Sequence, residues 1–157
     1  LFEALRQLPR RDWRLDIVGD GPERAHYEQM AADLDLAAQV IFHGFQPKSF
    51  VADLMRRADL FVLPSQWENL PCVLIEATAS GLPIVATNVG GIPEIVHEDA
   101  GALVPPADPP SLAAALAQVL AAADTVDRHL LAQRAISYSP TVVGATLGAI
   151  YRQVLRR

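Results

Sequence analysis

The sequence has one cysteine, little positive charge and no long apolar run, and each shortage excludes a class of protein. A single cysteine, Cys72, cannot form an intramolecular disulfide, so a disulfide-stapled secreted scaffold is excluded. The longest apolar stretch, residues 111–123, is too short to cross a bilayer, which takes about 20 residues. The first residues are charged and contain no signal peptide, so we expect a cytoplasmic protein without a transmembrane segment.

The charge balance argues against a polyanionic partner. The chain has 13 Lys and Arg against 18 Asp and Glu, a formal net charge of -5. A duplex nucleic-acid binder needs a basic stripe that displaces counterions, and a polybasic membrane patch is also missing. Hydrophobic residues make up 51% of the 157 residues, which is typical of a folded chain. We therefore expect one globular domain over residues 1–157.

Short apolar runs of strand length alternate with longer segments of helical period. This alternation is typical of parallel strands joined by crossover helices. Strands are predicted at residues 15–18, 40–42, 60–63, 83–86 and 102–104. Helices are predicted at residues 1–8, 23–36, 48–58 and 70–80, and three more form a tail at 111–123, 127–137 and 141–155. The expected fold class is α/β, a Rossmann-like doubly wound parallel sheet with a helical C-terminal tail.

In such sheets ligands bind beyond the carboxyl ends of the strands, so the loops that follow the strands are the candidate sites. Gly19 and Gly21 follow the first strand, but Arg24 stands where the dinucleotide fingerprint requires its third glycine. We interpret this loop as a tight turn that can line a cleft. Gly44 and Phe45 follow the second strand, where glycine lets a flat ligand approach the backbone and the aromatic ring can cover it.

The third loop carries two glutamates around a helix start. Glu68 lies in the loop, and Glu76 follows it with seven residues between, inside the next helix. The start of this helix, at residues 70–73, offers free backbone donors and the positive end of the helix dipole, which suit a diphosphate. Carboxylates on either side can accept hydrogen bonds from sugar hydroxyls. Taken singly, each glutamate is most often a solvated surface acid, and Trp67 and Cys72 are more often packing residues.

The stretch from Glu68 to Glu76 resembles the Glu-x7-Glu signature of family-4 retaining glycosyltransferases, which have the GT-B fold. The resemblance continues through residues 19–22, 43–45, 84–94 and 101–105 and spans most of the chain. It implies that the chain is the donor-binding domain of an enzyme that transfers a hexose from a nucleotide diphosphate sugar to an acceptor with retention of configuration. Such enzymes serve polysaccharide biosynthesis, among other pathways.

The resemblance also implies a role for each matched residue. Glu68 would contact the donor hexose near the reacting carbon, and Glu76 would hold the ribose hydroxyls. The backbone near Gly44 and Phe45 would meet the base. The sugar and phosphates would meet the backbone of Asn69, Leu70, Pro71 and Cys72, and the cleft would be lined by Gly19, Gly21, Gly90 and Gly91.

The sequence departs from the family pattern in two places. Asn69-Leu70-Pro71 stands where many relatives have Gly-Phe-Gly. Asn69 tolerates the left-handed backbone that such a turn uses, whereas Pro71 removes one donor. Upstream, the family's first strand, its arginine and lysine and its acceptor domain are absent, so we expect these residues alone not to transfer sugar. We also expect the strands at 15–18 and 60–63 to close directly, or another segment to fill the gap between them, because unpaired backbone in a core is costly.

Other functions remain open at this stage. A nucleotide-sugar epimerase, a phosphorylase or a silent nucleotide-binding module could share the fold. The histidines at 26, 43, 97 and 129 lack the spacing of metal ligands, so no metal or other cofactor is expected. The expected partners are a nucleotide sugar and the acceptor domain, but no nucleic acid, while peripheral membrane contact of the intact enzyme stays open.

Overall fold

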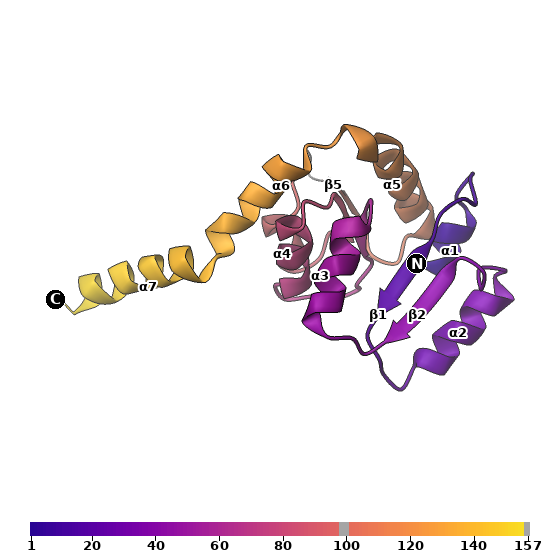
Figure 1. Ribbon diagram of the computed structural model, residues 1–157, viewed down its shortest axis with the longest axis horizontal. Helices are drawn as coiled ribbons and strands as arrows, with labels where there is room; N and C mark the ends of the chain where they lie inside the picture. Colours follow the sequence, from indigo (N-terminus) through magenta and orange to yellow (C-terminus); the bar gives the residue numbers. More distant parts are fainter. Residues whose placement is uncertain (98–100, 156–157) are drawn as a thin grey trace.

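The computed structural model describes residues 1–97 and 101–155, which form parallel strands alternating with helices (Figure 1). The strands are β1 (Leu15–Val18), β2 (Val40–Gly44), β3 (Phe61–Leu63), β4 (Ile84–Thr87) and β5 (Gly101–Val104). The helices are α1 (Phe2–Arg6), α2 (Arg24–Asp33), α3 (Lys48–Arg57), α4 (Cys72–Ala79), α5 (Pro109–Ala122), α6 (Arg128–Arg134) and α7 (Pro140–Val154). Short 3₁₀ turns are η1 (Ile92–Glu94), η2 (Ala123–Thr125) and η3 (Ala135–Tyr138).

All strand pairing is parallel, as predicted. β1 pairs with β2, with Leu15 opposite Val40, and β3, β4 and β5 pair in that order. Each strand begins within one residue of its predicted start, because bounded apolar runs of this length fit a sheet that is covered on both faces. The α/β fold class and the three-helix tail are confirmed.

Helices cover both faces of the β3–β4–β5 sheet. In β4, Val85 faces one core while Ile84 and Ala86 face the other, since successive strand residues point to opposite sides. The first core lies under α1 and α5 and includes Leu5 and Leu116. The members of the second core come from α3, α4, β4 with the turn before it, and the segment around η1: Met55, Leu74, Ala77, Leu82, Ile84, Ala86, Ile92, Ile95 and Val96.

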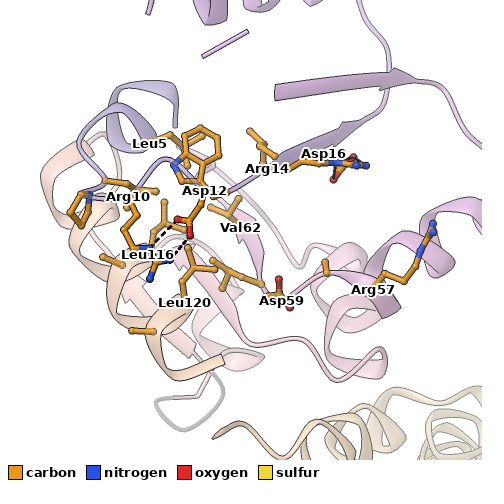
Figure 2. Close-up of a pocket in the computed structure, with 18 of the residues that line it drawn as sticks. Leu5, Arg10, Asp12, Arg14, Asp16, Arg57, Asp59, Val62, Leu116 and Leu120 are labelled. Carbon is orange, nitrogen blue, oxygen red and sulfur yellow. Dashed lines mark hydrogen bonds and ion pairs between the residues drawn. The ribbon is translucent and has the colours of Figure 1, made fainter. Parts of the chain in front are cut away.

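The sheet is divided into two pieces, so the prediction that β1 and β3 close directly, or that another segment fills the gap, is wrong. Among the described residues each of these strands pairs on one side only. A cavity of about 760 Å³, bordered by residues of both strands, is lined by apolar and charged side chains (Figure 2). The first core includes Val40 of one sheet and Val85 of the other, so shared packing joins the sheets without strand pairing. Trp13 also borders the cavity, and its buried Nε1 has no hydrogen-bond partner in the described chain.

The C-terminal helix α7 extends away from the rest of the molecule (Figure 1). None of its residues is buried, and large apolar side chains such as Leu147 and Ile150 are about half exposed. Within residues 1–97 and 101–155, no helix has both the length and the apolar character needed to cross a membrane.

Candidate functional site

The predicted site residues fall into two groups at the carboxyl ends of the strands. The first rim follows β1 and β2 and comprises Gly19, Gly21, Gly44 and Phe45. The second rim follows β3 and β4 and comprises Glu68, Asn69, Gly90 and Gly91. Loops that follow neighbouring parallel strands meet at one edge, which brings the members of each rim together. In the described part of the chain, no hydrogen bond or ion pair joins one rim to the other.

In the first rim, the backbone conformation at position 44 favours glycine. The amide of Gly19 donates a hydrogen bond to the carbonyl oxygen of Gly44 at 2.9 Å, which ties the two loops together. Gly44 has a φ of +66°, and a Cβ there would lie 2.7 Å from Nη1 of Arg24. Phe45 is 83% exposed, so its ring is free to cover a flat ligand.

Arg24 places a cation on the first rim, which the sequence analysis missed. Its Nε donates a hydrogen bond to Glu28 at 2.8 Å, and this bond raises the pKa of the guanidinium further. Its Nη2 donates to the carbonyl oxygen of Phe42 at 3.3 Å, across to β2. No local pattern signals this contact, because it depends on how α2 crosses the sheet.

In the second rim, one hydrogen bond holds the side chain of Glu68 and another holds the backbone of the next residue. The half-buried carboxylate of Glu68 accepts a hydrogen bond at Oε1 from the hydroxyl of Ser65, at 2.7 Å. The amide of Gly91 donates to the carbonyl oxygen of Asn69 at 2.6 Å. Ser65 was not predicted as a site residue, although a serine three residues before a glutamate is the spacing of a capping box and could have identified it.

The helix that follows Glu68 begins at Cys72, two residues later than predicted. Pro71 is its N-cap in an extended conformation, with a φ of -73° and a ψ of 112°, so the turn at residues 70–71 precedes the helix. The amide that proline lacks is therefore not one of the first-turn donors. The amides of Cys72 and Val73 begin the helix, and no side chain caps them. Asn69 does not use the left-handed conformation that its residue type allows.

Glu76 is exposed on α4, four residues after Cys72. Residues four apart share one helix face, and helical side chains lean toward the N-terminus, so Glu76 lies on the same face as the free first turn. The open crevice expected beside the two glutamates does not coincide with the large cavity, which borders neither of them.

Two packing predictions near the site are wrong. Trp67 is 81% exposed, and Cys72 is exposed as a free thiol. The loop at residues 64–71 contributes no residue to either core cluster, so its side chains lie outside the packed interior. In the described ranges, no group of three or more His, Cys, Asp or Glu side chains could hold a metal ion.

The chain matches a described protein family over most of its length. Residues 1–137 match the family described as glycosyl transferases group 1. The sequence is 32% identical over 161 residues to an alpha-D-kanosaminyltransferase of Streptomyces kanamyceticus, and the match covers 98% of this chain and 41% of that protein. It is 39% identical over 140 residues to WcaL of Escherichia coli, described as a colanic acid biosynthesis glycosyltransferase, covering 83% of this chain and 34% of WcaL.

Solved structures have the same fold. A sucrose-phosphate synthase from Thermosynechococcus elongatus superposes with a TM-score of 0.85 at 28% identity, over 99% of this chain and 41% of that one. HepE of Anabaena, solved in complex with UDP, superposes with a TM-score of 0.75 at 26% identity, over 99% of this chain and 44% of HepE. These neighbours are glycosyltransferases of the GT-B type. The chain thus spans less than half the length of the proteins that it matches.

Proposed function

The chain belongs to the glycosyl transferases group 1 family, and we propose that it is the part of such an enzyme that binds a nucleotide diphosphate sugar. One observation carries the proposal. Within nine residues, the loop after β3 and the helix that follows it present a positioned carboxylate at Glu68, an uncapped helix start at Cys72 and, at Glu76, a second carboxylate that is exposed. A carboxylate accepts from sugar hydroxyls, and an uncapped helix start favours phosphate, so the stretch offers partners to the hexose, the phosphates and the ribose.

Each part of the ligand then has its own partner. Glu68 contacts the hexose near the reacting carbon, and the backbone from Asn69 through Leu70 and Pro71 to Cys72 meets the sugar and the phosphates. Glu76 accepts hydrogen bonds from the ribose hydroxyls. The base lies against Gly44 and Phe45 of the first rim, where the 83% exposed ring supports stacking. The other glycines, Gly19, Gly21, Gly90 and Gly91, line the cleft.

In the intact enzyme, we propose hexose transfer with retention of configuration. Stabilising a departing diphosphate takes positioned donors and cations more than a covalent step, and the proposed scheme includes no metal or other cofactor. The two rims bind the donor, while the acceptor contacts come from parts of the enzyme outside these 157 residues. We therefore propose that these residues bind the donor without transferring its sugar. An exposed free thiol at Cys72 is in keeping with a cytoplasmic site of action.

Calorimetric titration tests the proposal. The chain is titrated with UDP, GDP and ADP and with their glucose conjugates, and we expect binding to at least one pair. Glu76→Ala should weaken binding of both the nucleotide and its sugar conjugate by about tenfold, since each contains the ribose. The matched control is Glu3→Ala, which removes an exposed glutamate on α1, far along the chain from either rim. Equal binding by Glu76→Ala and Glu3→Ala would remove the ribose role, and no binding by the unaltered chain would remove the proposed function.

A further inference from the structure

The carboxylate of Glu68 is held in place although it lies on an irregular loop. Residues 64–71 have no helix or strand, so a glutamate there would ordinarily sample several rotamers. The hydroxyl of Ser65 instead donates a hydrogen bond to Oε1 at 2.7 Å. Hydrogen bonds to a charged acceptor are among the stronger ones in proteins, so this contact selects one orientation of the carboxylate.

Ser65 is itself tied to the core of the sheet. The hydroxyl of Thr87 donates to the carbonyl oxygen of Ser65 at 2.5 Å. Thr87 is the last residue of β4 and is 2% exposed, so it is a rigid anchor. Two hydrogen bonds in series thus connect a buried strand end to the carboxylate of Glu68.

The loop after β4 holds the backbone on the other side of Glu68. A Cβ on Gly90 would overlap the carbonyl group of Glu68, and the amide of Gly91 donates to the carbonyl oxygen of Asn69 at 2.6 Å. Both the side chain and the backbone of Glu68 are therefore fixed by neighbours. Within residues 1–97 and 101–155, the second carboxylate oxygen, Oε2, accepts no hydrogen bond.

We propose that Ser65 is a positioning residue for donor binding: it occupies Oε1 of Glu68 and turns Oε2 toward a hydroxyl of the donor sugar. This inference rests on the proposed function, because it assumes that Glu68 contacts the sugar. A carboxylate ordered before the ligand arrives loses less rotamer entropy on binding, so the sugar contributes more affinity. The role is confined to the sugar half of the ligand, since the hydrogen bonds of Ser65 join Glu68 and Thr87 and neither of them reaches α4.

The test compares a nucleotide sugar with the same nucleotide lacking the sugar. UDP-glucose and UDP are titrated by calorimetry into the unaltered chain and into Ser65→Ala, Ser65→Thr and Glu68→Gln; the GDP or ADP pair replaces them if the chain prefers it. Ser65→Ala should weaken binding of UDP-glucose by about tenfold and leave that of UDP within about twofold. Ser65→Thr keeps the hydroxyl and should restore the affinity. Thr125→Ala is the matched control, because the hydroxyl of Thr125 also donates to a residue three positions away, at the carbonyl oxygen of Ala122, and lies in η2 outside both rims.

Each result has a defined meaning. If Ser65→Ala weakens UDP and UDP-glucose equally, the serine supports only the loop and the inference is overturned. If Glu68→Gln removes the preference for UDP-glucose while Ser65→Ala keeps it, the inference fails and the proposed function stands. If the unaltered chain binds UDP-glucose no more tightly than UDP, and Glu68→Gln changes neither, the sugar role of Glu68 fails and the inference fails with it.

Discussion

The α-carbon of Gly90 lies so close to the carbonyl oxygen of Glu68 that no side chain fits between them. Gly90 also has a φ of +54°, in the left-handed region that residues with a Cβ rarely adopt. The close approach of the Glu68 backbone therefore explains why residue 90, in the loop after β4, is a glycine. The Gly90-Gly91 pair was predicted to line a cleft, and the structure gives it a second task, which is to hold the loop that carries Glu68.

Gly90→Ala should lower the free energy of unfolding by about 2–4 kcal/mol, because the new Cβ meets backbone atoms that have no room to move and the left-handed φ becomes strained. Urea unfolding measures the change. Gly21→Ala is the matched control, since a Cβ there would meet nothing within 4 Å, and it should shift stability by less than about 0.5 kcal/mol. Equal stabilities for the two variants would contradict the close approach of Gly90 to the carbonyl oxygen of Glu68.

Arg128 connects the ends of two helices to α6. Its guanidinium donates hydrogen bonds to the carbonyl oxygens of Ala58 at 3.0 Å and of Ser80 at 3.3 Å, beyond the last turns of α3 and α4. Arg128→Ala leaves these carbonyl groups without that donor and should destabilise the fold by about 1–3 kcal/mol, measured by thermal unfolding.

Arg10→Ala is the control for Arg128. Arg10 pairs with Asp12 while its side chain is 81% exposed, and its loss should cost less than about 1 kcal/mol. If both arginine variants melt alike, the carbonyl contacts of Arg128 contribute nothing to stability.

The carboxylate of Asp16 in β1 should make the free energy of unfolding depend on pH. Burial acts to raise its pKa, but hydrogen bonds from Arg14 and from Nε2 of His43, the latter at 2.6 Å, outweigh burial and hold the pKa below the ordinary 3.8. A lowered folded-state pKa stabilises the fold above the unfolded value, and this stabilisation is lost as the pH falls through the folded value. Asp16→Asn should therefore cost about 1 kcal/mol at about pH 6 and less at about pH 3.

Denaturant unfolding of both proteins at the two pH values measures this difference. Asp124→Asn, which removes an exposed carboxylate in η2, should change stability by less than about 0.5 kcal/mol at either pH. A cost for Asp16→Asn that is equally large in acid would show that the variant acts through packing rather than charge.

Truncating a leucine should cost much more stability in α5, at the start of the helical tail, than in α7 at its end. Leu116 in α5 is 2% exposed inside the first core, whereas Leu147 in α7 is 48% exposed. Leu116→Ala should cost about 2–5 kcal/mol, because it removes buried contacts and leaves a cavity. Leu147→Ala should change stability by less than about 0.5 kcal/mol in urea unfolding. A large loss for Leu147→Ala would mean that α7 packs against another surface in solution.

The elements of this fold were predictable because their signals are local. Apolar runs between turn residues located β1 and β4, and the period of apolar positions located α3, which the structure places at Lys48–Arg57. The start of α4 was predicted two residues early, since apolar spacing does not show that Pro71 is extended. The stretch between Glu68 and Glu76 pointed to a glycosyltransferase, and the match over residues 1–137 confirms the coarser family, glycosyl transferases group 1.

The features that were missed depend on contacts between distant segments. Thr87 lies 22 residues from the Ser65 carbonyl group that it contacts, and no local pattern announces such a bond. In the sequence, Arg24 only marked the missing third glycine of the dinucleotide fingerprint. In the structure its guanidinium lies over Gly44 of β2. Trp67 was expected to pack because tryptophan usually does, but its side chain is 81% exposed on a loop outside both cores. The roles assigned to Glu68 and Glu76 stay predictions until ligand binding is measured.

The divided sheet has a consequence for how this chain behaves at high concentration. The facing sides of β1 and β3 leave amide and carbonyl groups without strand partners in the described chain, and such edges are templates for any extended polypeptide that fits between them. The chain should therefore self-associate as its concentration rises, and its β1 and β3 amides should exchange deuterium faster than those of β4, which is paired on both sides. Dilute solution should therefore keep this polypeptide from associating through the unpaired strand edges.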